Sequence, residues 1–260
     1  MPLADEFDGL LVDLDGVVWI GREPVPGSPE ALTALQAAGK QLVFVTNNPT
    51  KPPESYAKRL QGMGVEVGPE RIVTTGMTAA RLAGEAANGG GAFVIGAEPL
   101  KEMVAAAGAE PLVGEPAYAA EVVVVSGHRG FDFEELLTAK RALDAGAALV
   151  ATSHDPTMPM PGGEWPGTGA ILAAVETASG KTAAIGGKPE RHLFDLARVQ
   201  LGGAERVAMI GDRVPSDIAG GRSAGLATIL VLSGTTDEAE AAVADPAPDH
   251  VVADLAALLR

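Results

Sequence analysis

The sequence predicts an α/β fold built on a parallel, Rossmann-like sheet, and two features of the chain indicate it. Short apolar runs alternate with longer stretches of helical pattern, which is the rhythm of β-α units joined by right-handed crossovers. The apolar runs are also nearly continuous in Val, Leu and Ile instead of alternating with polar residues, as in strands that are buried on both faces.

The expected strands are the apolar runs themselves. They cover residues 9–14, 41–46, 71–75, 92–95, 121–125, 148–152, 206–210, 228–232 and 250–252. Several of the stretches between them carry helix-capping signals. We expect Ser28 and Asp132 to be the N-caps of two helices and Pro189 to lie in the first turn of another, with a glycine ending each helix.

Polar residues end some of these strands and not others. Asp13 and Thr46 end the first two strands, whereas the strands in the middle of the chain lack such endings. Because functional sites in open parallel sheets lie at the carboxyl ends of the strands, the polar endings are expected to share one site. Residues 77–185 are therefore predicted to form an inserted α/β domain with three strands of its own, and residues 1–76 and 186–260 to form the core.

Composition excludes some function classes. The chain has 260 residues, 47% hydrophobic content and a formal net charge of -15. A charge of this sign argues against nucleic acid as a partner, because phosphate backbones attract basic surfaces. An anionic substrate would need a local cluster of positive charge or a bound cation. The charge also has a plain alternative explanation, as a solubility feature or an adaptation to salt.

The chain has no cysteine, which excludes disulfides and thiolate metal sites. Its first residues are acidic and lack the basic and apolar layout of a secretory signal. No apolar run approaches the roughly 18 residues of a membrane span. We therefore expect a soluble, cytoplasmic protein without a membrane partner.

The carboxylates at the strand ends indicate a chemistry. Asp13 and Asp15 stand one residue apart after the first strand, and Asp212 follows a later one. Carboxylates this close repel one another unless a cation or a proton lies between them. No cysteine and no pair of histidines accompanies them, so the oxygen-only set favours Mg²⁺ over Zn²⁺. An aspartate can also attack phosphorus, while its neighbour protonates the leaving group and later activates water.

Each motif taken alone also has an ordinary structural explanation. "DLDG" is compatible with a solvated turn, "TNNP" with a plain turn, and Lys188 with a surface lysine. "GDRVPSD" is compatible with a turn followed by a helix that Ser216 caps. It is their combination, in this order and next to predicted strands or helix starts, that favours a shared active site.

Together these motifs resemble those of the haloacid dehalogenase (HAD) superfamily of phosphohydrolases. More narrowly, the chain is similar to subfamily IIA, the branch of the NagD-type, p-nitrophenyl-phosphate, phosphoglycolate, glycerol-phosphate and pyridoxal-phosphate phosphatases. The similarity runs nearly end to end. It is carried by "DLDGVVWIG", "FVTNN", "ATSHDPTMP", "PGTGAI", "GKP" and "GDRVPSDI".

The resemblance implies a role for each acidic residue. Asp13 matches the nucleophile that becomes a phospho-aspartate, and Asp15 matches the general acid/base. Asp13, the backbone carbonyl of Asp15 and Asp212 match the Mg²⁺ ligands. Gly16 and Asp217 match supporting positions.

The resemblance also implies phosphate-binding and specificity residues. Thr46, Asn47 and Lys188 match positions that bind the phosphoryl group, and Lys188 also neutralises the nucleophile. In this branch an inserted α/β cap domain of the C2 type covers the site and selects the substrate. His154 and Asp155 lie in a loop that can face the substrate, although a polar loop without that role explains them equally well.

The sequence thus predicts a Mg²⁺-dependent phosphatase that hydrolyses a small phosphate monoester through a phospho-aspartate. The alternatives are a non-catalytic binding or regulatory protein on the same scaffold, and a phosphotransferase. The substrate stays open among sugar phosphates, glycerol phosphate, phosphoglycolate, nucleotides, pyridoxal phosphate and p-nitrophenyl phosphate. The resemblance further implies a homodimer formed through the cap.

Overall fold

The computed structural model describes residues 1–160 and 163–260, which divide into two compact units. Unit 1 comprises Met1–Thr46, Pro52–Val73 and Lys188–Arg260, and unit 2 comprises Asn47–Lys51 and Thr74–Gly187. The prediction of an α/β fold with parallel sheets is confirmed.

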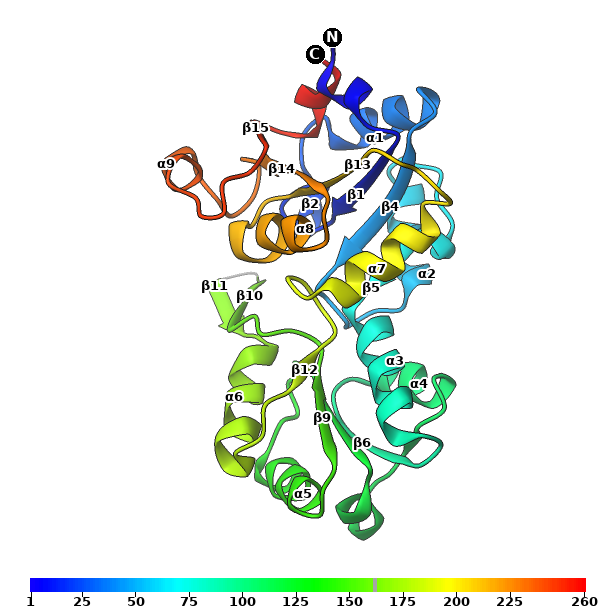
Figure 1. Ribbon diagram of the computed structural model, residues 1–260, viewed down its shortest axis with the longest axis vertical. Helices are drawn as coiled ribbons and strands as arrows, with labels where there is room; N and C mark the ends of the chain where they lie inside the picture. The colour runs from blue at the N-terminus through cyan, green and yellow to red at the C-terminus, as the bar shows by residue number, and fades with distance from the viewer. Residues whose placement is uncertain (161–162) are drawn as a thin grey trace. The chain divides into compact units, whose positions relative to one another are not determined.

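Unit 1 is built on a six-stranded sheet with the strand order β15-β14-β13-β1-β4-β5. Its strands are β1 (Gly9–Asp13), β4 (Gln41–Thr46), β5 (Ile72–Thr74), β13 (Val207–Gly211), β14 (Ala227–Val231) and β15 (His250–Val252), with the short hairpin β2 (Trp19–Ile20) and β3 (Glu23–Pro24). Its helices are α1 (Ser28–Ala37), α2 (Pro53–Gln61), α7 (Arg191–Gln200), α8 (Ala219–Ser223) and α9 (Glu238–Ala242), with short 3-10 turns and one π-helical turn at Val214–Ile218. Figure 1 shows β1 between β13 and β4.

The central strand of unit 1 is buried on both faces, as its unbroken apolar sequence predicts. All five residues of β1 are buried, and it pairs in parallel with β13 and β4. Leu10 and Val12 pack into a core that includes residues of α1 and α2, whereas Leu11 packs into a second core that includes residues of α7. Side chains alternate across a strand, so helices on both faces require apolar residues at every position.

Unit 2 is built on a separate five-stranded parallel sheet with the order β12-β9-β8-β6-β7. Its elements are α3 (Thr75–Ala87), β6 (Gly91–Ile95), α4 (Glu98–Ala106), β7 (Glu110–Pro111), β8 (Val122–Val125), α5 (Phe133–Asp144), β9 (Ala148–Ala151), the hairpin β10 (Thr157–Met160) and β11 (Gly163–Pro166), α6 (Thr168–Ser179) and β12 (Ala184–Ile185). The prediction of three strands here was therefore wrong. The two-residue strands β7 and β12 have too few residues to leave a recognisable apolar pattern, and the hairpin sequences TMPM and GEWP contain Pro, Gly or Glu and so form no apolar run.

The helix-capping predictions have mixed outcomes. Asp132 is the N-cap of α5, and its side chain accepts a hydrogen bond from the Glu135 amide. Ser28 is not an N-cap, because Gly27 occupies that position and the Ser28 hydroxyl instead donates to the Val17 carbonyl over 2.9 Å. Pro189 lies outside α7, whose N-cap is Glu190. Ser28 is fully buried, so its tertiary contact with Val17 outweighs local capping.

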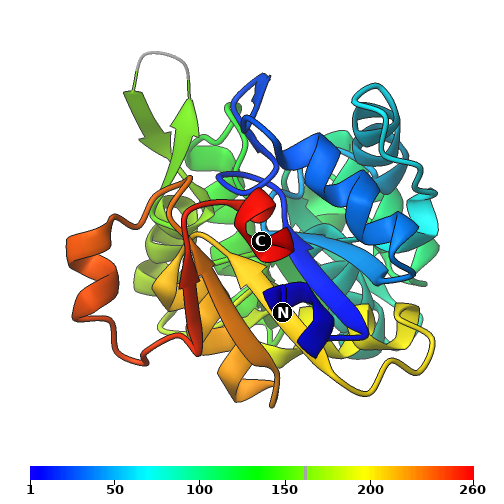
Figure 2. The same ribbon diagram turned by 90° about the horizontal axis from the view of Figure 1, so that it is seen from above.

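The two chain ends lie close together on unit 1, where the first and last 3-10 turns, Leu3–Glu6 and Leu255–Leu259, pack against each other (Figure 2). No helix among the described residues is both long and apolar enough to span a bilayer.

Candidate active site

The register of the central strands brings the predicted acidic residues to one edge of the unit 1 sheet. Val12 of β1 pairs with Ile210 of β13. Asp13 is therefore level with Gly211, and Asp212 follows one residue further on at the same edge of the sheet. Both side chains are buried, with exposed fractions of 6% and 1%. Burial of two carboxylates side by side is unfavourable unless positive charge compensates them.

Lys188 supplies positive charge from a distant part of the chain. Its side chain is 3% exposed, and its Nζ donates hydrogen bonds to Oδ1 of Asp13 and to Oδ1 of Asp217, each over 2.6 Å. Burial acts to lower the pKa of Lys188, but the charges and hydrogen bonds of the two aspartates outweigh it and raise that pKa. Lys188 is thus held as an ammonium ion between two carboxylates.

For the buried aspartates Asp13 and Asp212, burial outweighs the nearby positive charge. Burial raises the pKa of Asp13 well above its usual value, Asp217 and Asp212 push it the same way, and Lys188 opposes them. Burial also raises the pKa of Asp212, and the nearby charge of Asp217 adds to this effect. One lysine does not neutralise three buried carboxylates, so the cluster favours a further cation.

The geometry fits a divalent metal ion. Carboxylate oxygens of Asp13, Asp212 and Asp217 all lie within 4.8 Å of one another. Both oxygens of Asp217 already accept hydrogen bonds, from Lys188 and from the Arg213 amide. Oδ2 of Asp212 accepts one from the Thr235 amide, while its buried Oδ1 has no partner among the described residues. A buried carboxylate oxygen of this kind in an oxygen-only set suits Mg²⁺.

Glycines make room for these carboxylates. A Cβ on Gly16 or on Gly234 would lie 2.3 or 2.2 Å from Oδ2 of Asp212, and one on Gly211 would lie 2.2 Å from the Asp217 side chain. Gly16 also has a φ of +89°, a conformation that disfavours other residues. Gly16, predicted as a supporting position, therefore admits the Asp212 side chain next to the β1 turn.

The side chain of Asp15 lies outside the metal-binding group of carboxylates. Its Oδ1 accepts a hydrogen bond from the Trp19 indole over 2.9 Å, and the Arg59 guanidinium lies over the Trp19 ring, 3.8 Å from its centroid. Burial raises the pKa of Asp15, whereas the Trp19 hydrogen bond and the charge of Arg59 act to lower it. Neither contact was predicted from the sequence. The available signal was a Trp four residues after the aspartate, just past a glycine turn.

The remaining predicted residues divide between the two units. Thr46 is the last residue of β4 in unit 1 and is 1% exposed. Asn47 follows it but belongs to unit 2, where its amide donates to Oδ2 of Asp155 over 3.1 Å. His154 is exposed beside Asp155. The structure therefore joins Asn47 to one of the two candidate specificity residues.

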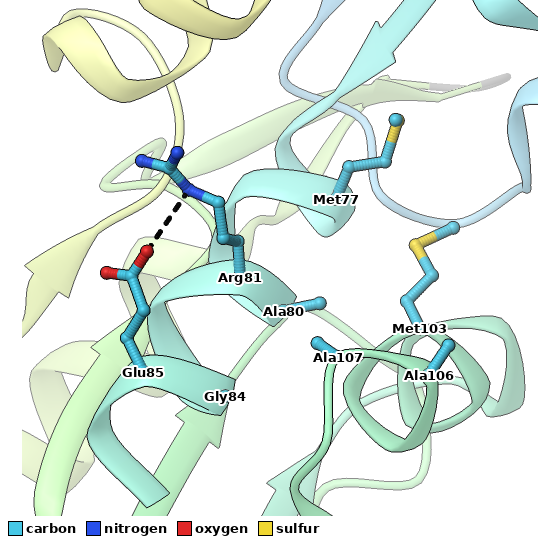
Figure 3. A pocket seen from close by; sticks show the side chains of 8 residues that line it. All are labelled: Met77, Ala80, Arg81, Gly84, Glu85, Met103, Ala106 and Ala107. Atoms are coloured by element: carbon cyan, nitrogen blue, oxygen red, sulfur yellow. Dashed lines mark ion pairs between the residues drawn. The ribbon is translucent and has the colours of Figure 1, made fainter. Parts of the chain in front are cut away.

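Unit 2 also has a groove of its own between α3 and α4 (Figure 3). Met77 of α3 and Met103 of α4 line it, and Arg81 and Glu85 form an ion pair of 3.6 Å at its side. Small residues form the rest of the lining, and this groove contains none of the predicted site residues.

Comparisons with known proteins show the family of the chain. A family model described as haloacid dehalogenase-like hydrolase matches residues 10–110, and a second model of HAD-like hydrolases matches residues 185–258. Chronophin from Mus musculus is 37% identical over 272 residues, covering 98% of this chain and 93% of the relative. The chain belongs to the haloacid dehalogenase-like hydrolase family.

Other members of the HAD family have named activities. The D-glycerol 3-phosphate phosphatase of Mycobacterium tuberculosis is 35% identical over 259 residues, covering 98% of this chain and 72% of the relative. A crystal structure of glycerol phosphate phosphatase from the same organism, in complex with magnesium, matches with a TM-score of 0.92 at 34% identity. It covers 100% of this chain and 78% of the other. These matches confirm the resemblance to the HAD phosphatases.

Proposed function

We propose that this HAD-family protein is a Mg²⁺-dependent phosphatase that hydrolyses a small phosphate monoester through a phospho-aspartate on Asp13. One observation carries the proposal. Lys188 bridges two buried carboxylates, Asp13 and Asp217, beside an Asp212 oxygen that has no partner among the described residues. Phosphoryl transfer needs mainly such positioning and charge neutralisation.

The residues divide the reaction between them. Oδ2 of Asp13 is the candidate nucleophile, because Oδ1 is held by Lys188. Attack on phosphorus breaks the ester P–O bond, and Asp15 donates its proton to the leaving oxygen. Asp15 then takes a proton from the water that attacks the phospho-aspartate, which releases inorganic phosphate and regenerates Asp13.

The metal would be held by Asp13, by Oδ1 of Asp212 and by the backbone carbonyl of Asp15. When bound, Mg²⁺ supplies positive charge that neutralises the transferring phosphoryl group. Asp217, both of whose oxygens are engaged, orients Lys188 and supports the site without being a ligand.

Thr46 and Asn47 are proposed to bind the phosphoryl group, and the inserted domain, residues 77–185, to act as a cap that selects the ester. The hydrogen bond between Asn47 and Asp155 supports a link between phosphate binding and the loop that carries His154. Asp155→Ala is expected to change the order in which esters are preferred, and an unchanged order would contradict this role.

Glycerol phosphate is the first ester to test, because relatives are named for hydrolysing it. The decisive experiment measures inorganic phosphate released from a panel of phosphate esters, with Mg²⁺ and with a chelator. Asp13→Asn should abolish release without lowering the melting temperature, since the variant keeps the side-chain volume and removes one of three buried carboxylates, while Asp217 still pairs with Lys188. Asp5→Asn, an exposed change in the same unit, is the matched control.

The outcomes separate the alternatives. Release that depends on the metal and on Asp13 supports the proposed phosphatase. Binding of an ester without release would indicate a binding protein, and transfer to an added alcohol in preference to water would indicate a phosphotransferase.

The cytoplasmic location, the homodimer and the absence of nucleic-acid and membrane partners also stay predictions. Light scattering of the purified protein would test the homodimer, and a monomeric mass at assay concentration would contradict it.

A further inference from the structure

Asp15 lies in a tightly closed loop between β1 and β2. The Gly16 amide donates to the Trp19 carbonyl over 2.7 Å, and the Val18 amide donates to the Leu14 carbonyl over 2.9 Å. The Ser233 hydroxyl fixes the same loop from outside, donating to the Gly16 carbonyl over 2.8 Å. The chain thereby returns Trp19 beside Asp15, and the two residues form an isolated parallel bridge.

The Trp19 indole is itself held in place. Its side chain is 1% exposed and belongs to the main core of unit 1. The Arg59 guanidinium covers the ring 3.8 Å from its centroid, and Nη2 of Arg59 donates to the Gly21 carbonyl over 2.8 Å. A ring fixed on several sides loses little further freedom when its N–H bonds to a carboxylate.

The two carboxylate oxygens of Asp15 have different hydrogen-bonding environments. Oδ1 accepts the indole N–H over 2.9 Å, whereas in the part of the chain that the structure describes Oδ2 makes no hydrogen bond. A carboxyl group anchored through one oxygen presents the other in a defined direction. We propose that Trp19 is a positioning residue for the acid/base Asp15, and that Arg59 acts by holding the indole.

The inference rests on the proposed phosphatase function and gives it a specific geometric requirement. When Asp13 attacks phosphorus and the ester P–O bond breaks, the proton on Oδ2 of Asp15 moves to the leaving oxygen, which departs as an alcohol. An alkyl alkoxide is a poor leaving group and needs this proton. A nitrophenolate is stable as an anion and leaves without it.

The test therefore compares two esters in Trp19→Phe, which keeps an aromatic ring but loses the N–H. The measured quantity is kcat/KM, since it reports the steps up to phosphorylation of Asp13. For glycerol phosphate kcat/KM should fall about tenfold or more, and for p-nitrophenyl phosphate it should stay within about twofold. Arg59→Lys, which keeps the positive charge near Asp15 but loses the planar guanidinium over the indole, should show the same selective loss to a smaller degree, and it tests the inference independently if Trp19→Phe does not fold.

A protein that already carries Asp15→Asn provides the control, because it shows whether Trp19 acts through Asp15. Adding Trp19→Phe to Asp15→Asn should cause no further selective loss, because the acid that Trp19 positions is already absent. Equal losses on both esters, or no loss on either, would overturn the inference while leaving a wild-type phosphatase intact. Failure of the wild type to hydrolyse any ester would instead overturn the proposed function.

Discussion

Lys188 is the residue on which the charge balance of the site depends. It is almost fully buried between Asp13 and Asp217, whereas the other lysine and arginine ion pairs of the described residues lie on the surface. Exposed pairs contribute little to stability because water and salt screen them. A buried pair behaves differently, since removal of one partner leaves an uncompensated charge.

Lys188→Met should therefore abolish phosphate release and lower the free energy of unfolding of unit 1 by about 3 kcal/mol in the presence of a chelator. Urea unfolding with a probe in unit 1 would measure this change. Arg191→Met in the same unit is the matched control, because Arg191 forms an exposed pair of 3.0 Å with Asp195, and its effect should be much smaller. Similar losses in the two variants would contradict the buried-charge argument.

At the level of elements, the site is formed by the loops that follow parallel strands. The turn after β1 carries Asp15 and Gly16, and the loop after β13 carries Asp212. The loop after β14 donates the Thr235 amide to Asp212. These loops approach one another closely only where a glycine removes a side chain, so backbone spacing sets the position of the carboxylates.

Gly234→Ala tests this point. Its Cβ would lie 2.2 Å from Oδ2 of Asp212, which must then move away from the Thr235 amide. We expect Mg²⁺ affinity to fall at least about tenfold, measured by calorimetry, with a parallel loss of activity. Gly62→Ala at the end of α2 is the control, because its nearest contacts are an ordinary 3.4 and 3.5 Å. Unchanged Mg²⁺ affinity in Gly234→Ala would show that Asp212 is not a ligand.

At the scale of the whole molecule, the described residues form two units, each with its own main sheet and its own pair of hydrophobic cores. All the candidate metal ligands lie in unit 1. A ligand that binds only the folded state stabilises the unit that binds it. Mg²⁺ should therefore protect unit 1 more than unit 2, and the protection should depend on pH.

The sign of that pH dependence follows from the raised pKa values of Asp13 and Asp212. A raised pKa means that the folded state holds protons that the unfolded state has released. Without metal, these groups therefore destabilise unit 1 progressively as pH rises from the unfolded pKa through the folded pKa. Mg²⁺ competes with the same protons, so its stabilising effect should grow over that range.

Hydrogen exchange, followed with and without Mg²⁺ between about pH 5 and about pH 8, measures both effects. Amides of β13 should gain protection from Mg²⁺, by about 3 kcal/mol when the metal is at a hundredfold excess over its Kd. Amides of β8 in unit 2 serve as the internal control and should change little. Equal protection of both strands, or greater protection at the acidic end, would contradict a metal site at Asp13 and Asp212.

The fold class could be predicted from the sequence, because strands buried on both faces need unbroken apolar runs, and this pattern is local. The sequence also predicted the acidic residues Asp13, Asp15 and Asp212, because polar side chains stand out at the ends of such runs. It located Lys188 and Asp217 only through their resemblance to family motifs, since nothing in the local pattern indicates that a lysine is buried.

Only the tertiary structure decided what each of these groups contacts. Lys188 donates a hydrogen bond to Asp13, which lies 175 positions earlier in the sequence. The guanidinium of Arg59, 40 positions after Trp19, lies over the Trp19 ring. Two-residue strands such as β12 exist only because a neighbouring strand pairs with them. Local patterns record burial and turn preference, whereas long-range pairing depends on how the whole chain closes, and that closure placed Arg59 over the indole that bonds to Asp15.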